Sequence, residues 1–388
     1  MNRNAACASP TKSPELLAKY ADSLLRKSNK ANEEEDLEQS LVDTVSKIWR
    51  RFLLVSEPGL TYILLGDQMI VFKYIEDKDV FQKFYSRLLS KRLIMFSSSS
   101  DDAESNMITK LKDACGYEYT SKLQRMFQDM ALCKDLNDQF KEKMTASHEP
   151  KDLELDFHIL VLGTAAWPLQ PPTSELKMPT ELVKTYERFH GFYMNKHSGR
   201  KLTWLWQNTR IELRTTYTNQ KYFFMTSAYQ AAILLLFNAG SDSLTYDEIL
   251  TGTGMQTTTL RPLIDLLTKQ RVLDLKDDAY ELNLGFKSKK IRINLNTPVK
   301  SEVKAESQDV MKTVDEDRKL LIQAVIVRVM KSRKQMKHQQ LIAEAIEQLK
   351  SRFVPKVTDI KKAIDTLLDK ECKHGWLSCP MREPSGPD

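Results

Sequence analysis

The sequence predicts a mainly α-helical protein with α+β parts: a helical bundle, an α/β domain with a winged-helix-like unit, and a C-terminal winged-helix domain. Three observations support this fold class. Apolar residues recur at helical spacing from residue 15 to about residue 150. The period then changes, and short strand-like runs alternate with helices over residues 151–296. From residue 316 onward, three further helical segments follow in the order of a winged-helix unit.

The composition is that of an ordinary globular protein. The residues are 41% hydrophobic and 28% charged, as in soluble globular proteins. A chain of 388 residues is long enough for two or three domains that each have a hydrophobic core. The net charge of +6 permits an acidic partner but falls short of a dedicated nucleic-acid binder. The five cysteines are scattered and odd in number, which indicates a reducing compartment, and we expect a cytoplasmic and nuclear protein. No apolar run approaches the ~20 residues of a membrane span, so we expect no membrane partner.

The helical bundle is predicted over residues 15–150, after a small, polar lead-in over residues 1–14 that we expect to be disordered. One segment, residues 45–68, interrupts an amphipathic helix with a Pro-Gly pair and an unpatterned apolar mix. Without it, four apolar residues fall on one helical face: Leu37, Leu41, Met69 and Phe72. We interpret residues 45–68 as an atypical insertion and hypothesise a retained intron read in frame. Further helices are predicted over residues 79–93, 104–115, 121–132 and 136–144, with Asp101 and Asp102 as caps of the second.

The α/β domain, residues 151–296, is predicted to open with a strand over residues 155–162, which a glycine and a Trp-Pro pair close. A helix over residues 181–195 follows. Residues 201–206 and 212–217 then alternate in a way that predicts a hairpin.

A winged-helix-like unit is predicted at about residues 223–275, because helix, helix, helix and short strand follow one another there. Two more short strands come after it. Residues 297–315 are charged and lack aromatic side chains, so they are predicted to be a linker.

The C-terminal domain, residues 316–388, has an atypical end from residue 372, where a Pro/Gly-rich tail stands in place of a two-stranded wing. Its first helix is apolar almost all round between Leu320 and Met330, which predicts packing on more than one side. Lys331 is the first side chain to leave this stretch, and basic residues follow it. Composition alone interprets Lys331 as a base that complements a helix C-terminus.

No catalytic constellation stands out. The chain has no nucleophile elbow, no phosphate-binding glycine loop and no pair of histidines at ligand spacing. Cys372, His374 and Cys379 are irregularly spaced, so no metal site and no cofactor are predicted.

Three blocks of sequence, residues 71–81, 118–127 and 198–204, resemble the C-terminal half of an SCF-type cullin. Residues 326–331, with the sequence Ile-Val-Arg-Val-Met-Lys, are similar to the cullin neddylation motif. The resemblance covers nearly everything from residue 13 to residue 371. It implies a non-catalytic scaffold of a ubiquitin ligase complex in protein catabolism, rather than an enzyme.

The same resemblance implies roles for particular residues. Lys331 matches the lysine that receives a ubiquitin-like modifier. A RING-box protein adds a strand to the α/β domain of a cullin, and the candidate contact is the predicted strand: Phe157, His158, Ile159, Leu160, Val161 and Leu162. The RING-box protein recruits a ubiquitin-conjugating enzyme, whose acidic tail could be attracted by Arg26, Lys27 and Lys30. The long N-terminal arm that holds a substrate adaptor is absent from the sequence given, so adaptor binding is not expected.

Two alternatives remain open. The two winged-helix patterns allow a protein that binds nucleic acid. Against this, Asp359, Asp365 and Asp369 on the final predicted helix would repel phosphate, so nucleic acid is not an expected partner. A truncated product without function is the other alternative, because the insertion and the altered end depart from the family pattern.

Overall fold

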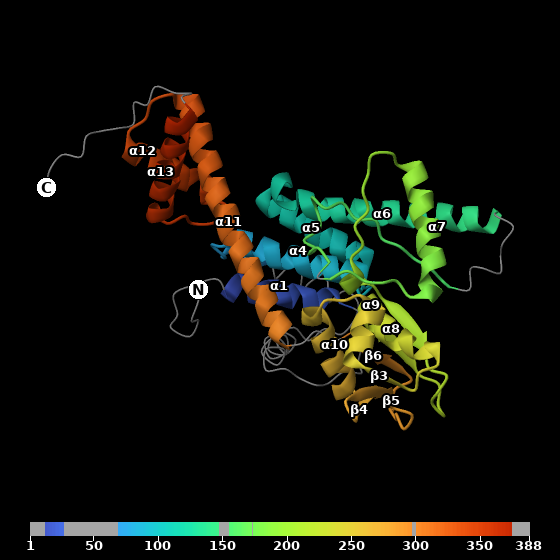
Figure 1. The fold of residues 1–388 in the computed structure, drawn as a ribbon. Helices are drawn as coiled ribbons and strands as arrows, with labels where there is room; N and C mark the ends of the chain where they lie inside the picture. The colour runs from blue at the N-terminus through green and yellow to red at the C-terminus, as the bar shows by residue number, and fades with distance from the viewer. Residues whose placement is uncertain (1–11, 27–68, 147–154, 173, 297–299, 375–388) are drawn as a thin grey trace, which may run out of the picture. The chain divides into compact units, whose positions relative to one another are not determined.

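The computed structural model describes residues 12–26, 69–146, 155–172, 174–296 and 300–374 (Figure 1). The chain divides into two compact units. The first contains the residues up to Gln128, the stretch Gly163–Pro168 and the residues from Ser301 on; the second contains Asp129–Leu162 and Leu169–Lys300. Residues 45–68, interpreted as an insertion, and the part of the atypical end beyond residue 374 lie outside the described residues. None of the described helices is both long and apolar enough to cross a membrane.

The bundle helices of the described chain are α1 (Lys12–Leu25), α4 (Lys78–Ile94), α5 (Asp101–Cys115) and α6 (Tyr117–Ala146). Since α1 begins at Lys12, residues 12–14 are helical rather than part of the predicted disordered lead-in; residues 1–11 lie outside the described residues. The cap of α5 is Ser100, whose Oγ accepts from the backbone N–H of Asp102 at 3.1 Å and of Ala103 at 3.4 Å. Asp101 and Asp102, predicted as caps, instead lie in the first turn.

Helix α6 corrects a second prediction. Residues 121–132 and 136–144 were expected to form two helices, but they belong to one helix of 30 residues. The polar residues between them contain neither glycine nor proline, so nothing in the backbone interrupts the helix.

A buried ion network holds three of these helices together. Arg92 of α4 is 0% exposed, and its guanidinium donates to both carboxylate oxygens of Glu104 on α5, at 2.6 and 2.9 Å. It also donates to Asp22 of α1 at 2.5 Å. Because every member is hydrogen-bonded, the charges can stay buried without an unpaired group.

In the second unit, helix α7 (Thr180–Lys196) precedes a small mixed sheet. Strand β1 (Ile211–Arg214) pairs antiparallel with β2 (Phe223–Thr226), and β2 pairs parallel with β6 (Arg292–Asn294). The hairpin predicted between residues 201–206 and 212–217 is therefore wrong. The true partner of β1 is reached through a tight loop closed by a bond from Thr215 N–H to Tyr222 O at 2.9 Å.

The winged-helix-like unit is present in the predicted order. Its helices are α8 (Ala228–Leu235), α9 (Tyr246–Thr253) and α10 (Thr257–Lys269), and its sheet has the order β3 (Ser243–Thr245), β5 (Ala279–Leu282), β4 (Leu273–Lys276). Capping boxes start α8 and α9, at Ser227 with Gln230 and at Thr245 with Glu248. The core comes from one face of each helix, for example Ile249, Leu260 and Ile264.

Residues 300–315, predicted as a linker, are helical. They form the first half of α11 (Lys300–Arg333), a helix of 34 residues. The segment is charged, yet it has no glycine or proline after Lys300, and Val310 and Val314 are buried four residues apart on one face. A charged composition alone was therefore a poor guide to its structure.

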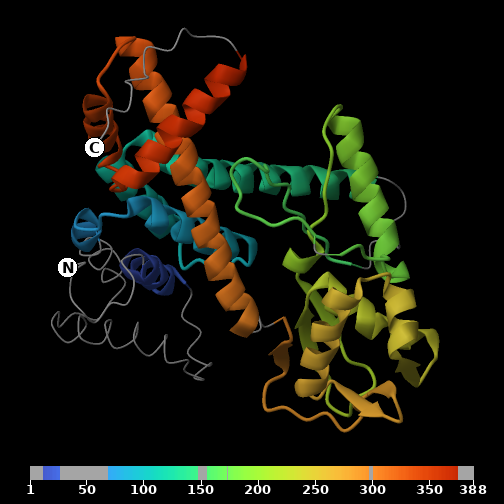
Figure 2. The same cartoon turned by 60° about the vertical axis from the view of Figure 1, so that its left-hand side comes forward.

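The C-terminal three-helix unit consists of the end of α11 with α12 (His338–Leu349) and α13 (Val357–His374), which lie beside it in both views (Figures 1 and 2). Helix α11 contributes a single stripe to this core: Ile322, Val325, Ile326 and Val329. Leu320 is 64% exposed and Ala324 is exposed, so the predicted packing on more than one side is wrong. Within the described part of this unit, residues 316–374, there is no strand.

Candidate functional site

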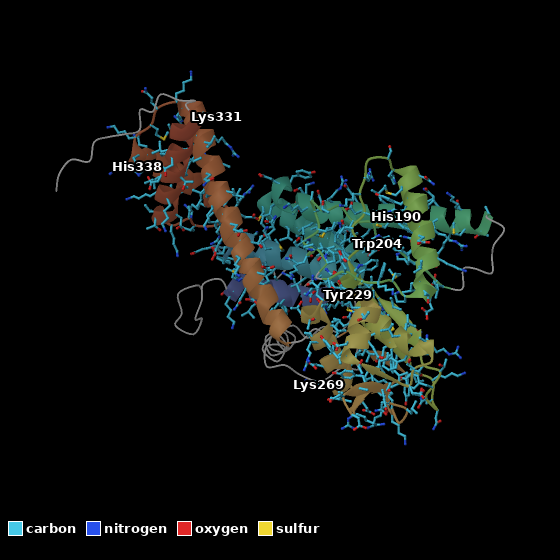
Figure 3. The ribbon with its side chains drawn as sticks, in the orientation of Figure 1. His190, Trp204, Tyr229, Lys269, Lys331 and His338 are labelled. Carbon is cyan, nitrogen blue, oxygen red and sulfur yellow. The ribbon has the colours of Figure 1, made fainter. Side chains whose placement is uncertain are left out.

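Lys331 lies in the last turn of α11, and its side chain is exposed (Figure 3). Val329, two residues earlier, belongs to the buried stripe, so the backbone below the lysine is fixed by packing. The helix ends at Arg333. Lys334 then adopts a left-handed conformation with φ 60°, and its N–H donates to Met330 O at 2.8 Å. A rigid helix end therefore presents the Lys331 amine to solvent.

Positive charge dominates the surroundings of Lys331. Four basic side chains near it in sequence are exposed: Arg328, Arg333, Lys334 and Lys337. Among the described residues, none of these four forms an ion pair with a carboxylate. An exposed primary amine is a nucleophile toward activated carbonyl groups, so the chemistry available here is amide-bond formation at Lys331 Nζ.

The middle of α11 is tied to the bundle by an ion-pair cluster, which we call the Arg318 clamp: Arg318, Asp77 and Asp79. Arg318 Nη2 donates to Asp77 Oδ1 and to Asp79 Oδ1, each at 2.7 Å, and Nε donates to the second oxygen of Asp79. The guanidinium also lies 4.6 Å from the ring centroid of Phe353. Beside the clamp, Lys83 pairs with Asp317 at 2.5 Å.

A second contact joins the C-terminal unit to the bundle. Arg352, just after α12, pairs with Glu118 at the start of α6 at 2.5 Å, and its carbonyl accepts from Lys78 N–H at 3.0 Å. The α12 end of the C-terminal unit and the middle of α11 are thus both anchored, whereas Lys331 lies in the last turn of α11 (Figure 3). Sequence analysis did not find these contacts, because their partners lie more than 200 residues apart.

The candidate docking segment, residues 157–162, does not form the predicted strand. These residues are irregular in hydrogen bonding and belong to neither sheet. Their side chains nevertheless alternate. Phe157, Ile159 and Val161 pack on a cluster with Phe140 and Phe189, while His158 is exposed. Side chains at alternate positions therefore face the cluster, as they would in the predicted strand, but the described part of the chain offers this segment no strand partner.

Two side chains of α6 hold the inward-facing residues of this segment. Asn137 is 3% exposed; its Oδ1 accepts from Ile159 N–H at 2.9 Å, and its Nδ2 donates to Ile159 O at 2.7 Å. One turn earlier, Cys133 Sγ accepts from Val161 N–H at 3.1 Å and donates to Val161 O at 3.3 Å. The signal available in the sequence was a polar residue on an otherwise apolar helix face, since Leu136 and Phe140 flank Asn137.

Burial and charge act on two groups of this region. The side chain of His158 is exposed but partly desolvated by its surroundings, and this desolvation, followed by the Lys141 charge, lowers its pKa. Burial also raises the pKa of the Cys133 thiol to about 11, although its hydrogen bond to Val161 acts in the opposite direction. The neutral forms of both side chains are therefore favoured at neutral pH.

A second stretch outside the helices and strands, residues 201–204, lies over the same apolar cluster. Leu202 and Trp204 alternate with exposed Lys201 and Thr203, and both pack where Phe157 and Ile159 do. Trp204 stacks on Trp206 with 5.6 Å between ring centroids, and the two indoles help to line a cavity of about 310 Å³. Figure 3 shows Trp204 beside α7. The structure places these tryptophans half in the core and half at the surface.

The three basic residues assigned to a conjugating-enzyme tail are only partly described. Arg26 follows α1 directly, pairs with Asp22 at 2.7 Å and forms an isolated bridge with Ser98. Lys27 and Lys30 lie outside the described residues. Their grouping with Arg26 therefore stays a prediction.

Comparison with known proteins identifies the family of the chain. Family models match three parts of the chain: the cullin alpha solenoid domain over residues 1–137, the cullin alpha+beta domain over residues 161–296, and the cullin protein neddylation domain over residues 317–372. The chain belongs to the cullin family. Within it, Lys331 lies inside the match to the neddylation domain, and α8 to α10 lie inside the match to the alpha+beta domain.

Full-length relatives show the same similarity over nearly the whole chain. Cullin-1 of Schizosaccharomyces pombe is 45% identical over 383 residues, which is 96% of this chain and 46% of the relative. Cullin-1 of Dictyostelium discoideum is 46% identical over 96% of this chain and 47% of the relative. Cullin-1 of Caenorhabditis elegans is 42% identical over 93% of this chain and 44% of the relative. This cullin chain thus spans about half the length of the curated relatives it matches.

Proposed function

We propose that this cullin chain is a non-catalytic scaffold of a ubiquitin ligase complex of the SCF type, activated by attachment of a ubiquitin-like modifier to Lys331. One observation carries the proposal. Residues 317–372 match the neddylation domain, and within that match Lys331 is an exposed amine at the end of a rigid helix. The charge and accessibility of this helix end support it, because the four nearby basic side chains have no acidic partner among the described residues.

The attachment step requires only the amine from this chain. Lys331 Nζ attacks the carbonyl carbon of a thioester that carries the modifier, a C–N bond forms, the C–S bond breaks and the carrier thiol leaves with the proton. The carrier enzyme supplies the activated thioester. The scaffold supplies position, since the packed stripe at Ile326 and Val329 fixes the backbone from which Lys331 extends.

A RING-box protein is the proposed partner of the second unit, and it would bring a ubiquitin-conjugating enzyme with it. Residues 157–162 and 201–204 pack alternate side chains on one cluster, as extended backbone does, yet neither stretch lies in a sheet of the described chain. Extended backbone without a strand partner is the substrate for β-augmentation. We further propose that Arg26, Lys27 and Lys30 attract the acidic tail of the conjugating enzyme, and that the chain acts in the cytoplasm and nucleus.

The scaffold proposal is tested by co-expressing the chain with a RING-box protein and then supplying the modifier with its conjugating enzymes. The expected result is a stable complex and one modified band that disappears in Lys331→Arg. Lys334→Arg is the matched control, since Lys334 is a second exposed lysine three residues away on the same helix end. Modification that persists in Lys331→Arg and disappears in the control would overturn the assignment of the site. Absence of a complex would overturn the scaffold role.

The tail proposal has its own measurement. Reversing the charges of Arg26, Lys27 and Lys30 to glutamate should slow ubiquitin chain growth, and more strongly at low salt, because exposed charges are screened over about 8 Å at physiological ionic strength. A rate that is unchanged at every salt concentration would contradict this role.

A further inference from the structure

We propose that Asn137 and Cys133 of α6 are positioning residues for the partner's strand. They occupy the inner edge of residues 157–162, so that a strand can be added only at the outer edge. This inference rests on the proposed docking role of the segment, and it specifies the edge and the residues that pair. We call the two side chains the α6 bracket.

Asn137 imitates a peptide group of a neighbouring strand. In an antiparallel pair, two residues that face each other exchange both N–H···O bonds. The side-chain amide of Asn137 makes the same exchange with Ile159, at 2.9 Å from Ile159 N and 2.7 Å from Ile159 O. The second hydrogen of Nδ2 is donated to Cys133 O at 2.6 Å, which fixes the orientation of the amide. Asn137 is therefore held in the rotamer that imitates a strand.

The spacing along the helix matches the spacing along the segment. Cys133 and Asn137 are one helical turn apart, a rise of about 6 Å. Ile159 and Val161 are two residues apart in extended backbone, a rise of about 6.6 Å. Cys133 meets Val161 and Asn137 meets Ile159, so the helix runs opposite to the segment. One face of a helix can thus replace a strand over two successive bonding positions.

The bracket leaves the other edge open. In extended backbone, the N–H and C=O groups of successive residues point to opposite edges. The backbone N–H and C=O groups of Ile159 and Val161 point at α6, so those of Leu160 and Leu162 point away from it. Within the described residues, the backbone of neither leucine makes a hydrogen bond. Edges of this kind are where other chains add strands.

The occupant that fits is an extended segment of the RING-box partner with apolar side chains at alternate positions. Leu160 and Leu162 are only half-buried, and they lie on the same side of the segment. A partner strand paired with their backbone would place its own apolar side chains against them. The bracket contributes by keeping the segment extended before the partner arrives, which lowers the ordering cost of binding.

The test measures amide hydrogen exchange and association kinetics on the full chain with a RING-box protein. In the wild type, the amides of Ile159 and Val161 should be protected with and without the partner, whereas those of Leu160 and Leu162 should gain protection only in the complex. Gain of protection at Ile159 and Val161, with none at the leucines, would overturn the proposal.

The variants Asn137→Leu and Cys133→Val separate positioning from folding. Asn137→Leu keeps the side-chain volume and removes the three hydrogen bonds that Asn137 makes to Ile159 and Cys133. We expect faster amide hydrogen exchange at Ile159. The association rate with the RING-box protein should fall by about tenfold, because the extended conformer becomes a minor population. The dissociation rate should change by less than about twofold, because the outer-edge bonds are intact. Cys133→Val, which removes the two hydrogen bonds to Val161, should change the exchange and association rates by less than Asn137→Leu does. Glu142→Leu, on the exposed side of α6, is the control.

Two outcomes distinguish this inference from the docking proposal. A wild-type chain that fails to bind the RING-box protein would overturn both. Normal wild-type binding, with faster exchange at Ile159 in Asn137→Leu and an unchanged association rate in both bracket variants, would overturn the positioning role alone.

Discussion

Replacing Arg318 with methionine should loosen the C-terminal unit from the bundle while leaving each of them folded. Methionine keeps an unbranched stem of similar length but removes the guanidinium, and it leaves Asp77 and Asp79 without their partner. The three side chains are 21%, 16% and 14% exposed, so the cluster is neither a surface pair nor a fully buried one. Burial opposes the charge of Arg318, but hydrogen bonds and charges from Asp79 and then Asp77 raise its pKa overall.

The loss of stability expected for Arg318→Met follows from the burial of the Arg318 clamp, which is intermediate between that of an exposed and a buried ion pair. Exposed pairs contribute about 0–1 kcal/mol, and breaking a buried pair costs about 3–5 kcal/mol. An intermediate value of about 2 kcal/mol is expected for Arg318→Met in the free energy of unfolding. Loss of the contact with the Phe353 ring accounts for about 0.5–1 kcal/mol of it.

A double-mutant cycle measures the clamp itself. The variants are Arg318→Met, Asp79→Asn and the pair together, with urea unfolding followed by circular dichroism. A coupling energy of about 1–2 kcal/mol between Arg318 and Asp79 is expected, because they share two hydrogen bonds. Lys319→Met, the exposed next residue, should change stability by less than about 0.5 kcal/mol. Additive effects in the cycle would refute the reasoning.

Three further outcomes are expected. Glu104→Gln should destabilise the first unit by about 3–5 kcal/mol in urea unfolding, because Arg92 would remain buried with its charge poorly paired; a loss below about 1 kcal/mol would contradict this. Alkylation of Cys133 should be slow at pH 8, where a thiol of pKa about 11 is about one-thousandth thiolate, and should rise about tenfold per pH unit up to pH 10; a plateau by pH 9 would count against it. His158 has a lowered pKa, so the unfolded chain binds the proton first, and stability should fall as the pH drops through 6.5 toward the folded pKa. That part of the fall should be missing in His158→Gln.

Much of the helical fold could be predicted from local spacing. Helices α1, α4, α7, α8, α10, α12 and α13 lie where apolar residues recur at three and four positions, because a helix satisfies its backbone within a few residues. The order of the winged-helix-like unit followed from the same signal. Lys331 was predicted as a modification site from the resemblance of residues 326–331 to the cullin neddylation motif, and its exposure follows from its place two residues beyond the buried stripe.

Errors appeared where the structure depends on which segments bond to each other, whether these are near or far in the chain. The partner of β1 is β2 rather than residues 201–206, since alternation shows that a strand can form but not what it pairs with. Residues 157–162 alternate as a strand should, but in this chain the bonds of Ile159 and Val161 go to α6.

By itself the sequence determined the helices, the winged-helix order and the candidate lysine, since each is encoded within a few residues. Only the tertiary structure showed which long-range contacts fix the positions of these elements. Arg318 reaches Asp79 across 239 residues of sequence, and no local period reports such a contact. The same holds for Asn137, whose value as a substitute strand depends on the helix turn and the extended segment having nearly equal rise. Long-range contacts form only when the chain folds. The candidate residues could therefore be predicted from the sequence, but the contacts that position them could not.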